Sequence, residues 1–285
     1  MKDIKILIAH HKPGMVIKSG MYLPLHVGKT ISKYKLDIQG DDTGDNISKL
    51  NPIFCEMTAV YWGWKNIKAD YIGLCHYRRY FTFKKASFSH RLSLKLKYAC
   101  IKNLGNLFRP GVNYAYNEQI LALDDNNLKK YTQCFENELS NRLESNDFDF
   151  IVPEPYKFAC RNNETFFSEI GRDHIQKLKD IVKFLHPDFY EYVEATLRSN
   201  TLFAANMCIF RYQLFDDYCN VVFSILKKHI ENVQFDNWCT DPISEKCYAR
   251  VSGYLAEILT NAYVLKMIKE KKKGLFVNVL FCKYL

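Results

Sequence analysis

The most constraining feature of the sequence is a short apolar run at residues 71–75, YIGLC, followed at once by the polar cluster HYRRY at residues 76–80. An apolar run of this length favours a buried strand. Ligands of open α/β sheets bind beyond the carboxyl ends of the strands, where this polar cluster would lie. Because Arg is almost never buried without a partner, Arg78 and Arg79 require an anion or carboxylates, and a diphosphate suits the guanidinium fork. Taken alone, adjacent arginines are more often surface charge, but their position after a buried strand favours ligand binding.

The segment before this strand predicts a sharp loop and then a helix. Residues 41–46, DDTGDN, are crowded with turn-forming side chains. Ser48 or Asn51 can cap the start of the helix, and Pro52 suits its first turn. Apolar residues then recur at helical spacing and give the helix one buried face: Phe54, Met57, Val60, Tyr61 and Trp64. The loop itself is either a solvated turn or part of a binding site.

Length and composition indicate a large core in one domain or two fused subdomains. The chain has 285 residues, of which 48% are hydrophobic and 15% aromatic, and this excludes a disordered protein. Its ten cysteines show neither CxxC spacing nor the Cys/His pairing of zinc fingers, so disulfides and zinc are not expected. The first residues lack the features of a signal peptide, and no window approaches the roughly eighteen uninterrupted apolar residues of a membrane span. We therefore expect a reduced, cytoplasmic protein.

The charge of the chain predicts an anionic partner. Forty basic and 31 acidic residues give a net charge of +9, which suits nucleic acid, anionic lipid or a phosphorylated substrate. Residues 84–109 carry seven Lys or Arg and no acidic residue. They form either a basic patch that docks on an anionic membrane or a solvated helical hairpin; RNA binding is disfavoured because no stacking-platform motif is present. The tail at residues 266–285 is either a second docking surface or a core strand.

The first half of the chain predicts further elements. Residues 5–9 favour a first strand that ends in the loop HHKPG, whose two adjacent histidines would point in different directions and would not hold a metal together. Residues 21–28 predict an extended or looped connection, and residues 31–38 a second short strand. Residues 116–143 predict a helix.

The second half predicts strands at 147–153 and 201–210 and helices at 166–185, 186–197, 215–230 and from 250 onward. Asn206 interrupts the second strand; a buried Asn must find partners, so it either ties neighbouring backbone or contacts a ligand. Glu257 lies among apolar neighbours, where the pKa of a carboxyl group tends to rise, as suits a general base. A salt bridge to Arg250 or to Arg78 and Arg79 would explain Glu257 equally well.

The chain resembles a family of bacterial capsular and exopolysaccharide biosynthesis glycosyltransferases, long catalogued as a domain of unknown function. The resemblance rests on DDTGDNIS (41–48), on Asn51, Glu56 and YWGWKN (61–66), and above all on YIGLCHYRRYF (71–81). It continues through ANMCIF (205–210), YCNVVFSIL (218–226) and RVSGYLAEIL (250–259) to about residue 265.

The resemblance implies an α/β, GT-A-like fold with a Rossmann-type central sheet flanked by helices. We expect a single domain with a nucleotide-sugar half at residues 1–83, a basic helical insertion at 84–145, and an acceptor-side half with a C-terminal helix and tail at 146–285. The family further implies a sugar-nucleotide donor, and some of its members are linked to galactofuranose transfer.

The implied reaction moves a sugar from a nucleotide diphosphate donor, a UDP-sugar such as UDP-galactofuranose, to a lipid-linked glycan in capsule, exopolysaccharide or O-antigen synthesis. The departing diphosphate needs positive charge, which Arg78 and Arg79 would supply. A divalent cation, Mg²⁺ or Mn²⁺, is an optional cofactor. Many GT-A enzymes hold their metal with a DxD triplet that follows a strand; Asp147 and Asp149 precede theirs, so we interpret them as an ordinary strand entrance.

The candidate site residues follow from these roles. The catalytic candidates are Glu257, as the base of an inverting reaction, and His76. The remaining candidates bind the donor (His10, Lys12, Asp42, Asp45, Asn46, Arg78, Arg79 and Asn206) or the acceptor (His174 and Tyr254), and no metal ligands are predicted.

A rival interpretation is a non-catalytic scaffold that binds polysaccharide or an anionic membrane. Such a scaffold would bind no nucleotide sugar, so binding measurements separate the two classes. The expected partners are therefore a nucleotide-sugar donor, a lipid-linked oligosaccharide acceptor and an anionic membrane surface, reached through residues 84–109 or the tail, and no nucleic acid. The protein is expected in the cytoplasm, either free or peripheral at the inner face of the cell membrane.

Overall fold

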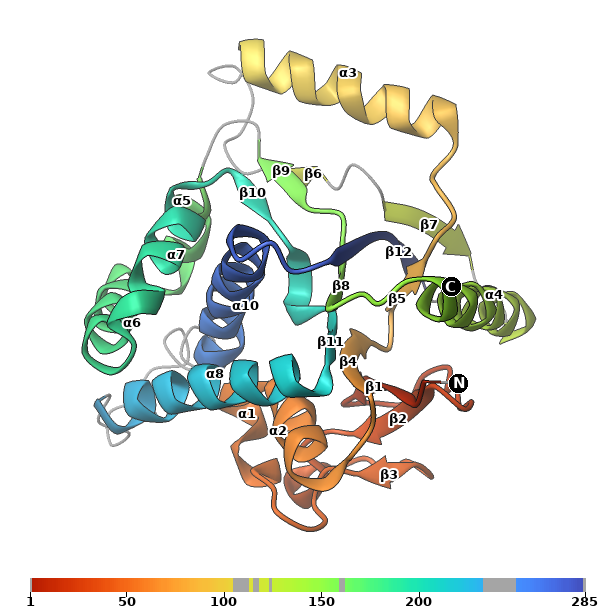
Figure 1. Ribbon diagram of the computed structural model, residues 1–285, viewed down its shortest axis with the longest axis horizontal. Coiled ribbons are helices and arrows are strands. Elements are labelled where there is room, and N and C mark those ends of the chain that lie inside the picture. The colour runs from red at the N-terminus through yellow and green to blue at the C-terminus, as the bar shows by residue number, and fades with distance from the viewer. Residues whose placement is uncertain are drawn as a thin grey trace.

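A mixed β-sheet runs through the molecule, with helices on both of its faces (Figure 1). The structure is a computed structural model that describes residues 2–104, 113–114, 118–122, 125–158, 162–232 and 250–283. In these ranges the strands are β1 (Ile4–His10), β2 (Tyr22–His26), β3 (Gln39–Gly40), β4 (Tyr71–His76), β5 (Arg79–Thr82), β6 (Asn113–Tyr114), β7 (Glu118–Ala122), β8 (Phe150–Pro153), β9 (Tyr156–Phe158), β10 (Thr201–Leu202), β11 (Cys208–Arg211) and β12 (Gly274–Lys283).

The helices of the described ranges are α1 (Asn51–Phe54), α2 (Met57–Asn66), α3 (Phe88–Leu104), α4 (Asp125–Ser145), α5 (Asn163–Phe167), α6 (Arg172–Leu185), α7 (Pro187–Arg198), α8 (Tyr212–Asn232) and α10 (Val251–Lys269). Short 3-10 turns lie at Lys29–Ile31, Ser48–Leu50, Ser168–Ile170 and Ala204–Asn206. The predicted helices at 186–197 and 215–230 and the helix that starts after Arg250 are confirmed, and the helix predicted at 166–185 is confirmed for its larger part, α6.

The sheet has a parallel half and a mixed half. Strands β3, β2, β1 and β4 are parallel neighbours in that order, so their carboxyl ends meet at one edge. Strand β11 then pairs antiparallel with β4 and β8. The first half of β12 pairs with β8, and its second half pairs with β5 and β7. A separate small sheet contains β10, β9 and β6.

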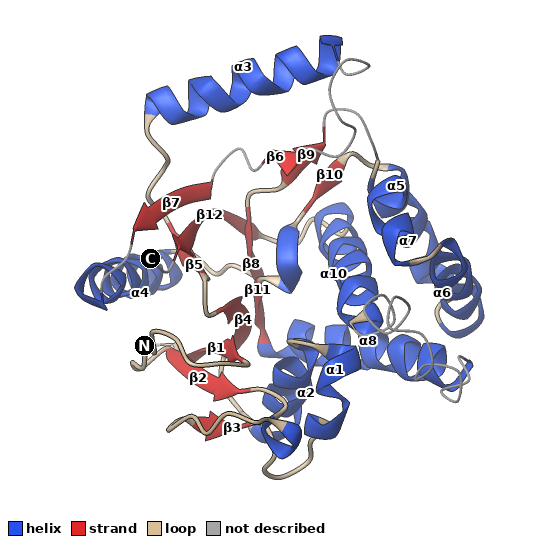
Figure 2. Cartoon of the chain, turned by 180° about the vertical axis from the view of Figure 1, so that it is seen from behind, coloured by secondary structure: helices blue, strands red, loops and turns tan. Residues whose placement is uncertain are grey.

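Two apolar cores hold the layers together. One core packs α2, α6, α7, α8 and α10 against one face of the sheet, with fully buried residues such as Leu7, Leu74 and Leu259. The other packs α4 against the opposite face through Leu128, Phe135 and Leu139. The view from behind shows the same order, with α4 on one side of the strands and the larger helical layer on the other (Figure 2).

The packing at Gly73 explains why β4 carries a glycine in its centre. A Cβ atom at this position would lie 2.5 Å from the carbonyl oxygen of Cys208 and 2.6 Å from Cγ1 of Ile209. Strand β11 can therefore approach β4 this closely only because residue 73 has no side chain.

Several local predictions were wrong. Residues 31–38 contain no strand; the second strand is β2, which lies in 21–28, where the extended form of the predicted connection is present. The helix expected across 51–66 is broken into α1 and α2 at Cys55, whose φ is 50°. Residues 118–122, expected to be helical, form a strand on β12, while residues 116–117 lie outside the described residues.

Two open alternatives are resolved by the fold. Asp147 and Asp149 lie at the entrance of β8, where both carboxylates face Arg211 at 2.7 and 3.6 Å, as the strand-entrance interpretation expects. The apolar part of the tail is β12, a strand of the main sheet. Within the described residues, no helix combines the length and apolarity needed to cross a membrane.

Candidate active site

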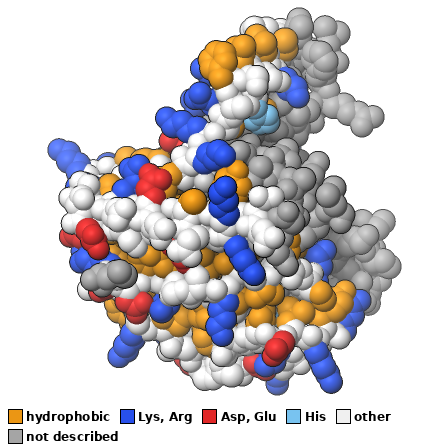
Figure 3. All heavy atoms as spheres, turned by 90° about the vertical axis from the view of Figure 1, so that its right-hand side faces the viewer, with side chains coloured by type: hydrophobic (Ala, Val, Ile, Leu, Met, Phe, Trp, Pro, Cys, Tyr) orange, Lys and Arg blue, Asp and Glu red, His pale blue; other side chains and the backbone are white. Residues whose placement is uncertain are grey.

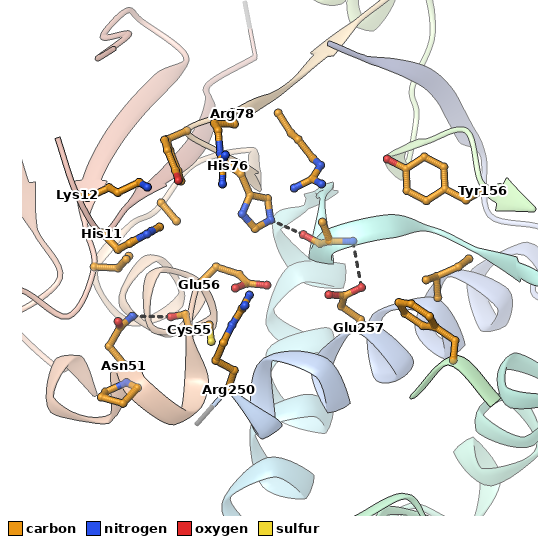
Figure 4. Close-up of a pocket in the computed structure, with 18 of the residues that line it drawn as sticks. His11, Lys12, Asn51, Cys55, Glu56, His76, Arg78, Tyr156, Arg250 and Glu257 are labelled. Atoms are coloured by element: carbon orange, nitrogen blue, oxygen red, sulfur yellow. Dashed lines mark hydrogen bonds between the residues drawn. The ribbon is translucent and has the colours of Figure 1, made fainter. Parts of the chain in front are cut away.

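A cleft of about 760 Å³ opens at the edge where the parallel strands β1, β2 and β4 end. This is the position at which open α/β sheets bind their ligands. Its walls also include α1, the start of α10 and the small sheet (Figure 4). The lining side chains are Ala9, His11, Lys12, Val27, Asn51, Pro52, Cys55, Glu56, His76, Tyr77, Arg78, Arg79, Tyr156, Phe158, Phe166, Leu202, Ala205, Arg250 and Glu257.

One end of the cleft is cationic and is organised around the buried ring of Tyr77. Lys12 Nζ lies 5.9 Å from the ring centroid, and the Arg78 guanidinium lies 5.1 Å from it. The His11 ring meets the same ring edge-on at 5.2 Å. Burial lowers the pKa of His11, and the charge of Lys12 adds to this effect. The ring of Tyr77 therefore holds two cationic side chains within reach of one ligand, with His11, whose lowered pKa favours the neutral ring, beside them.

The two adjacent arginines point to different neighbours because they lie on a tight hairpin. His76 of β4 pairs with Arg79 of β5, so Tyr77 and Arg78 form the turn. Arg78 is exposed at this turn beside Tyr77, whereas the Arg79 guanidinium lies 5.0 Å from the ring of Phe281 on β12. Both arginines nevertheless line the cleft.

Two carboxylates, Glu56 and Glu257, lie near the middle of the cleft (Figure 4). Burial raises the pKa of Glu257 to about 7, and the nearby charge of Glu56 adds to the rise. Glu56 Oε1 accepts a hydrogen bond from Asn206 Nδ2 at 2.9 Å. A carboxyl group with a pKa close to neutrality can both take up and release a proton at physiological pH.

One residue, Ala205, bridges His76 and Glu257 through its backbone. His76 Nε2 donates to the carbonyl oxygen of Ala205 at 2.6 Å, and the Ala205 N–H donates to Glu257 Oε2 at 3.4 Å. Because a carbonyl oxygen only accepts, the hydrogen of His76 must be on Nε2. Burial lowers the pKa of His76, which favours the neutral ring. His76 therefore helps to orient the backbone of Ala205, whose N–H contacts the carboxylate.

The backbone around the cleft adopts left-handed conformations at residues other than glycine. Cys55, Ala205, Asn206 and Arg250 have φ values of 50°, 61°, 55° and 85°. Each such residue costs about 1–3 kcal/mol, and such outliers cluster at functional sites. Three of the four line the cleft, and the fourth, Asn206, contacts a lining carboxylate.

Arg250 brings the start of α10 against the turn between α1 and α2. Its backbone N–H donates to the carbonyl oxygen of Pro52 at 2.7 Å, and its guanidinium lies 5.3 Å from the ring of Tyr254. Burial raises the pKa of the neighbouring Cys55 thiol to about 12, so this sulfur is a thiol at neutral pH. Burial thus disfavours the thiolate, which is the nucleophilic form of cysteine.

The opposite end of the cleft is apolar. Tyr156 and Phe158 come from β9, Phe166 from α5 and Leu202 from β10. Phe158 and Phe166 pack at 5.1 Å between ring centroids. The cleft therefore changes along its length from basic to aromatic, with the two carboxylates between (Figure 4).

Five of the predicted site residues line this cleft: Lys12, His76, Arg78, Arg79 and Glu257. The donor-loop candidates lie elsewhere. Asp42 faces Lys29 at 3.5 Å, Asp45 accepts from the Tyr61 hydroxyl at 3.1 Å, and Asn46 accepts from the Ser48 N–H at 3.2 Å. These side chains hold the loop at residues 41–46 together.

The remaining candidates are buried behind the cleft or beside it. His10 is fully buried next to His26 at the ends of β1 and β2. Asn206 is also fully buried and bonds within the protein, to Glu56, to the Gly253 carbonyl oxygen and to the Thr260 hydroxyl. These contacts match the alternative in which Asn206 forms hydrogen bonds with neighbouring protein groups and not with a sugar.

The two acceptor candidates do not line the cleft either. His174 is buried on α6, where its Nδ1 lies 3.2 Å from His229 Nε2. Tyr254 lies beside the cleft and contacts it through Arg250.

Sequence reasoning missed several lining residues, among them His11, Cys55 and Arg250, and assigned no role to Glu56. Glu56 had a signal, since it belongs to the pattern that carried the family resemblance. The sequence also held a signal for His11, because this residue lies in the loop that follows the first predicted strand. Among the described residues, no three His, Cys, Asp or Glu side chains are arranged as a metal site.

Comparison with known proteins agrees with this architecture. The apo structure of WbbM, a bifunctional glycosyltransferase, matches 99% of this chain with a TM-score of 0.79 and 27% sequence identity. The chain spans 45% of the length of that WbbM chain. The α/β fold is therefore GT-A-like, as predicted. The chain belongs to the family described as Domain of unknown function (DUF4422), whose model matches residues 5–270. None of the curated proteins compared with the chain matches it.

Proposed function

We propose that this protein is a glycosyltransferase that moves a sugar from a nucleotide diphosphate donor to a hydroxyl group of a glycan. The observation that carries the proposal is the order of groups along the cleft, in which basic side chains at the sheet edge adjoin Glu257, whose pKa is raised to about 7. The similarity to WbbM, described as a bifunctional glycosyltransferase, supports the same class of reaction.

The basic end of the cleft would bind the diphosphate of the donor. The bond to the departing diphosphate breaks with a build-up of negative charge, and preorganised cations stabilise that charge. Arg78 and Arg79, with Lys12 and Arg250, line the cleft and would supply such charge, and guanidinium groups suit phosphate oxygens in particular. The donor would be a UDP-sugar, UDP-galactofuranose among the candidates.

Glu257 would act as the general base that takes the proton from the acceptor hydroxyl, in an inverting reaction. A base works best when its pKa lies near the operating pH, which burial beside Glu56 provides. His76 would be a positioning residue, because it reaches Glu257 through the Ala205 peptide. A divalent cation, when bound, would add charge at the diphosphate, and Glu56 is the lining carboxylate that would hold it while Glu257 serves as the base.

The experiment is calorimetry and turnover with UDP, UDP-glucose, UDP-galactose and UDP-galactofuranose, each with and without EDTA. Arg78→Ala should lower turnover by about 10²-fold, the loss seen when one transition-state donor is removed, without changing the melting temperature. Arg198→Ala is the matched control, since this side chain is 78% exposed on α7. Wild-type turnover in the Arg78 variant would refute the assignment, and a chain that bound none of these nucleotides would be the scaffold.

We further propose that the acceptor is lipid-linked, in capsule, exopolysaccharide or O-antigen synthesis, and that helix α3 holds the protein at the inner face of the membrane. Helix α3 stands away from the main body, at the top of Figure 1. Phe88, Leu92 and Leu96 are 74%, 44% and 59% exposed and recur every four residues, so they share one face.

The charge around this apolar face suits an anionic lipid surface. Helix α3 has no acidic residue, and Lys95 and Lys97 are exposed beside the apolar row. In the space-filling view, the part that projects at the top carries hydrophobic side chains with Lys and Arg around them (Figure 3). Each basic residue contributes about 1 kcal/mol near an anionic leaflet. The tail at residues 266–285 is the weaker candidate for membrane docking, because its apolar strand β12 belongs to the sheet.

Vesicle co-sedimentation tests the membrane proposal. We expect binding to phosphatidylglycerol vesicles but not to phosphatidylcholine vesicles, with loss of binding when Phe88, Leu92 and Leu96 are all changed to Ser. Phe184→Ser is the control, because Phe184 is 79% exposed on α6. Equal binding of the triple variant and the control would exclude α3 as the docking surface.

A further inference from the structure

We propose that the aromatic end of the cleft is the subsite for the acceptor sugar, which it binds through the apolar C–H face of the sugar ring. The subsite consists of Tyr156, Phe158, Phe166 and Leu202, none of which carried a predicted role. This inference rests on the proposed transferase function and names the place and the chemistry of its second substrate.

The four side chains form a wall that the fold holds in place. They come from β9, α5 and β10, elements of the small sheet and its adjacent helix, and not from the strands at the basic end. Asn162 caps α5 by accepting from the Thr165 N–H at 2.9 Å. Asn163, fully buried, donates to the carbonyl oxygens of Thr196 and Thr201 at 2.7 and 2.8 Å, which fixes α5 against α7 and β10. A ligand would therefore meet a preformed surface.

The chemistry of this wall suits a neutral ring and disfavours a phosphate. Phe158 is buried beneath the surface, while Tyr156 and Phe166 are half-buried and line the cleft. A sugar ring has a face of C–H groups that packs against aromatic rings, and its hydroxyls point outward to polar partners. The dianionic diphosphate gains nothing at such a wall, and it has cationic partners at the other end.

The position of Glu257 agrees with this assignment. In Figure 4, Glu257 lies between the side chains of His11 and Lys12 on one side and the ring of Tyr156 on the other. A base that deprotonates an acceptor hydroxyl must lie within hydrogen-bond reach of that hydroxyl, beside the point where the acceptor meets the donor sugar. An acceptor on the aromatic wall would present its hydroxyl toward the carboxylate from the side opposite the donor phosphates.

The nucleobase of the donor is the other group that could stack on an aromatic wall. The nucleoside has a better place at the opposite end, where Ala9 and Val27 mark the carboxyl ends of parallel strands β1 and β2. Asn51 and Pro52 line the same end, which offers a polar and an apolar contact for a base. The aromatic wall is thus left for the acceptor.

Saturation-transfer NMR with methyl β-D-galactopyranoside and methyl β-D-glucopyranoside, in the presence of UDP, tests the subsite. We expect saturation transfer from the protein to be strongest for the ring protons on one face of the glycoside. The affinity for the glycoside should fall at least about fivefold in Tyr156→Ala and in Phe166→Ala, a loss of about 1 kcal/mol. UDP affinity, measured by calorimetry, should stay unchanged. Phe184→Ala provides the matched control on exposed α6 surface, and circular dichroism confirms folding.

Distinct results overturn this inference and the proposed function. A fall in UDP affinity in the two variants would assign the wall to the nucleobase. Binding of octyl but not methyl glycosides would assign it to an alkyl chain, and absence of saturation transfer in the wild type would remove the subsite altogether; each result rejects the acceptor assignment. If the wild type bound the glycosides through Tyr156 and Phe166 but bound no UDP or UDP-sugar, the transferase would fail while the sugar site remained.

Discussion

Replacing Glu257 with Gln should stabilise the protein at alkaline pH while it abolishes transfer. Burial and the charge of Glu56 raise the pKa of Glu257 from 4.5 to about 7. The folded state therefore binds the proton of Glu257 more tightly than the unfolded state does, so the contribution of this group to stability is greatest below pH 4.5 and is lost as the pH rises through about 7. Gln keeps the shape and the acceptor for the Ala205 N–H but has no charge to bury.

The size of the effect follows from the shift. A rise from 4.5 to about 7 corresponds to about 3 kcal/mol at most, since each pKa unit is worth about 1.4 kcal/mol. Water that enters the cleft screens the charge, so we expect Glu257→Gln to be about 1–2 kcal/mol more stable than the wild type at about pH 8 and equally stable at about pH 4.5.

Urea denaturation of both proteins across this pH range measures the difference. All other titrating groups are common to the two proteins, so the difference in unfolding free energy isolates Glu257. The reasoning would be refuted if the difference were independent of pH, or if the Gln variant were the less stable protein at alkaline pH.

Three further predictions concern the scaffold. Gly73→Ala should lower the unfolding free energy by about 1–3 kcal/mol, because its Cβ would meet the carbonyl oxygen of Cys208 at 2.5 Å; Gly20→Ala, with nothing within 4 Å, should be neutral in the same urea titration. Asp41→Ala should cost about 3 kcal/mol, because its buried carboxylate accepts two backbone N–H groups and a Ser hydroxyl; a neutral result would contradict this role. Burial beside a second histidine lowers the pKa of His229 to about 3, so the wild type should lose stability as the pH falls below 6.5, and His229→Gln should flatten that loss; equal slopes would count against it.

The strand edge that carries the site could be predicted, because its signal is local. A buried strand that is followed at once by His76, Tyr77, Arg78 and Arg79 is compatible with few folds. One of them is a parallel sheet whose strand ends carry the polar residues, as around β4. The raised pKa of Glu257 could also be predicted from the sequence. A carboxyl group among apolar neighbours has a raised pKa once its helix packs into the core.

The loop at residues 41–46 shows why side-chain type alone was not enough. Asp41 uses its carboxylate to hold the backbone of Gly28 and Lys29, where a ligand-binding Asp would have used the same oxygens on a sugar. Local sequence does not determine which hydrogen-bond donor such a carboxylate will contact. Hydrophobic periodicity predicted one continuous helix across Cys55 for a related reason. The apolar spacing continues on both sides of this residue, whereas the break in the helix lies where Cys55 contacts α10.

The aromatic end of the cleft had no local signal at all. Tyr156 and Leu202 lie on strands of three and two residues, which exist because they pair with each other. Their approach to Glu257 depends on contacts between segments about fifty residues apart or more. Such an arrangement is decided by tertiary packing and not by propensity.

The placement of β12 has a consequence for how the molecule is made. Strand β12 pairs with β5, β7 and β8, all of which precede it by more than a hundred residues of translation. Until residues 274–283 leave the ribosome, the edges of β5 and β8 stay open to wrong partners, as unpaired edges do. The nascent chain should therefore depend on chaperone protection late in synthesis, and truncation before residue 274 should yield aggregates instead of a smaller folded protein.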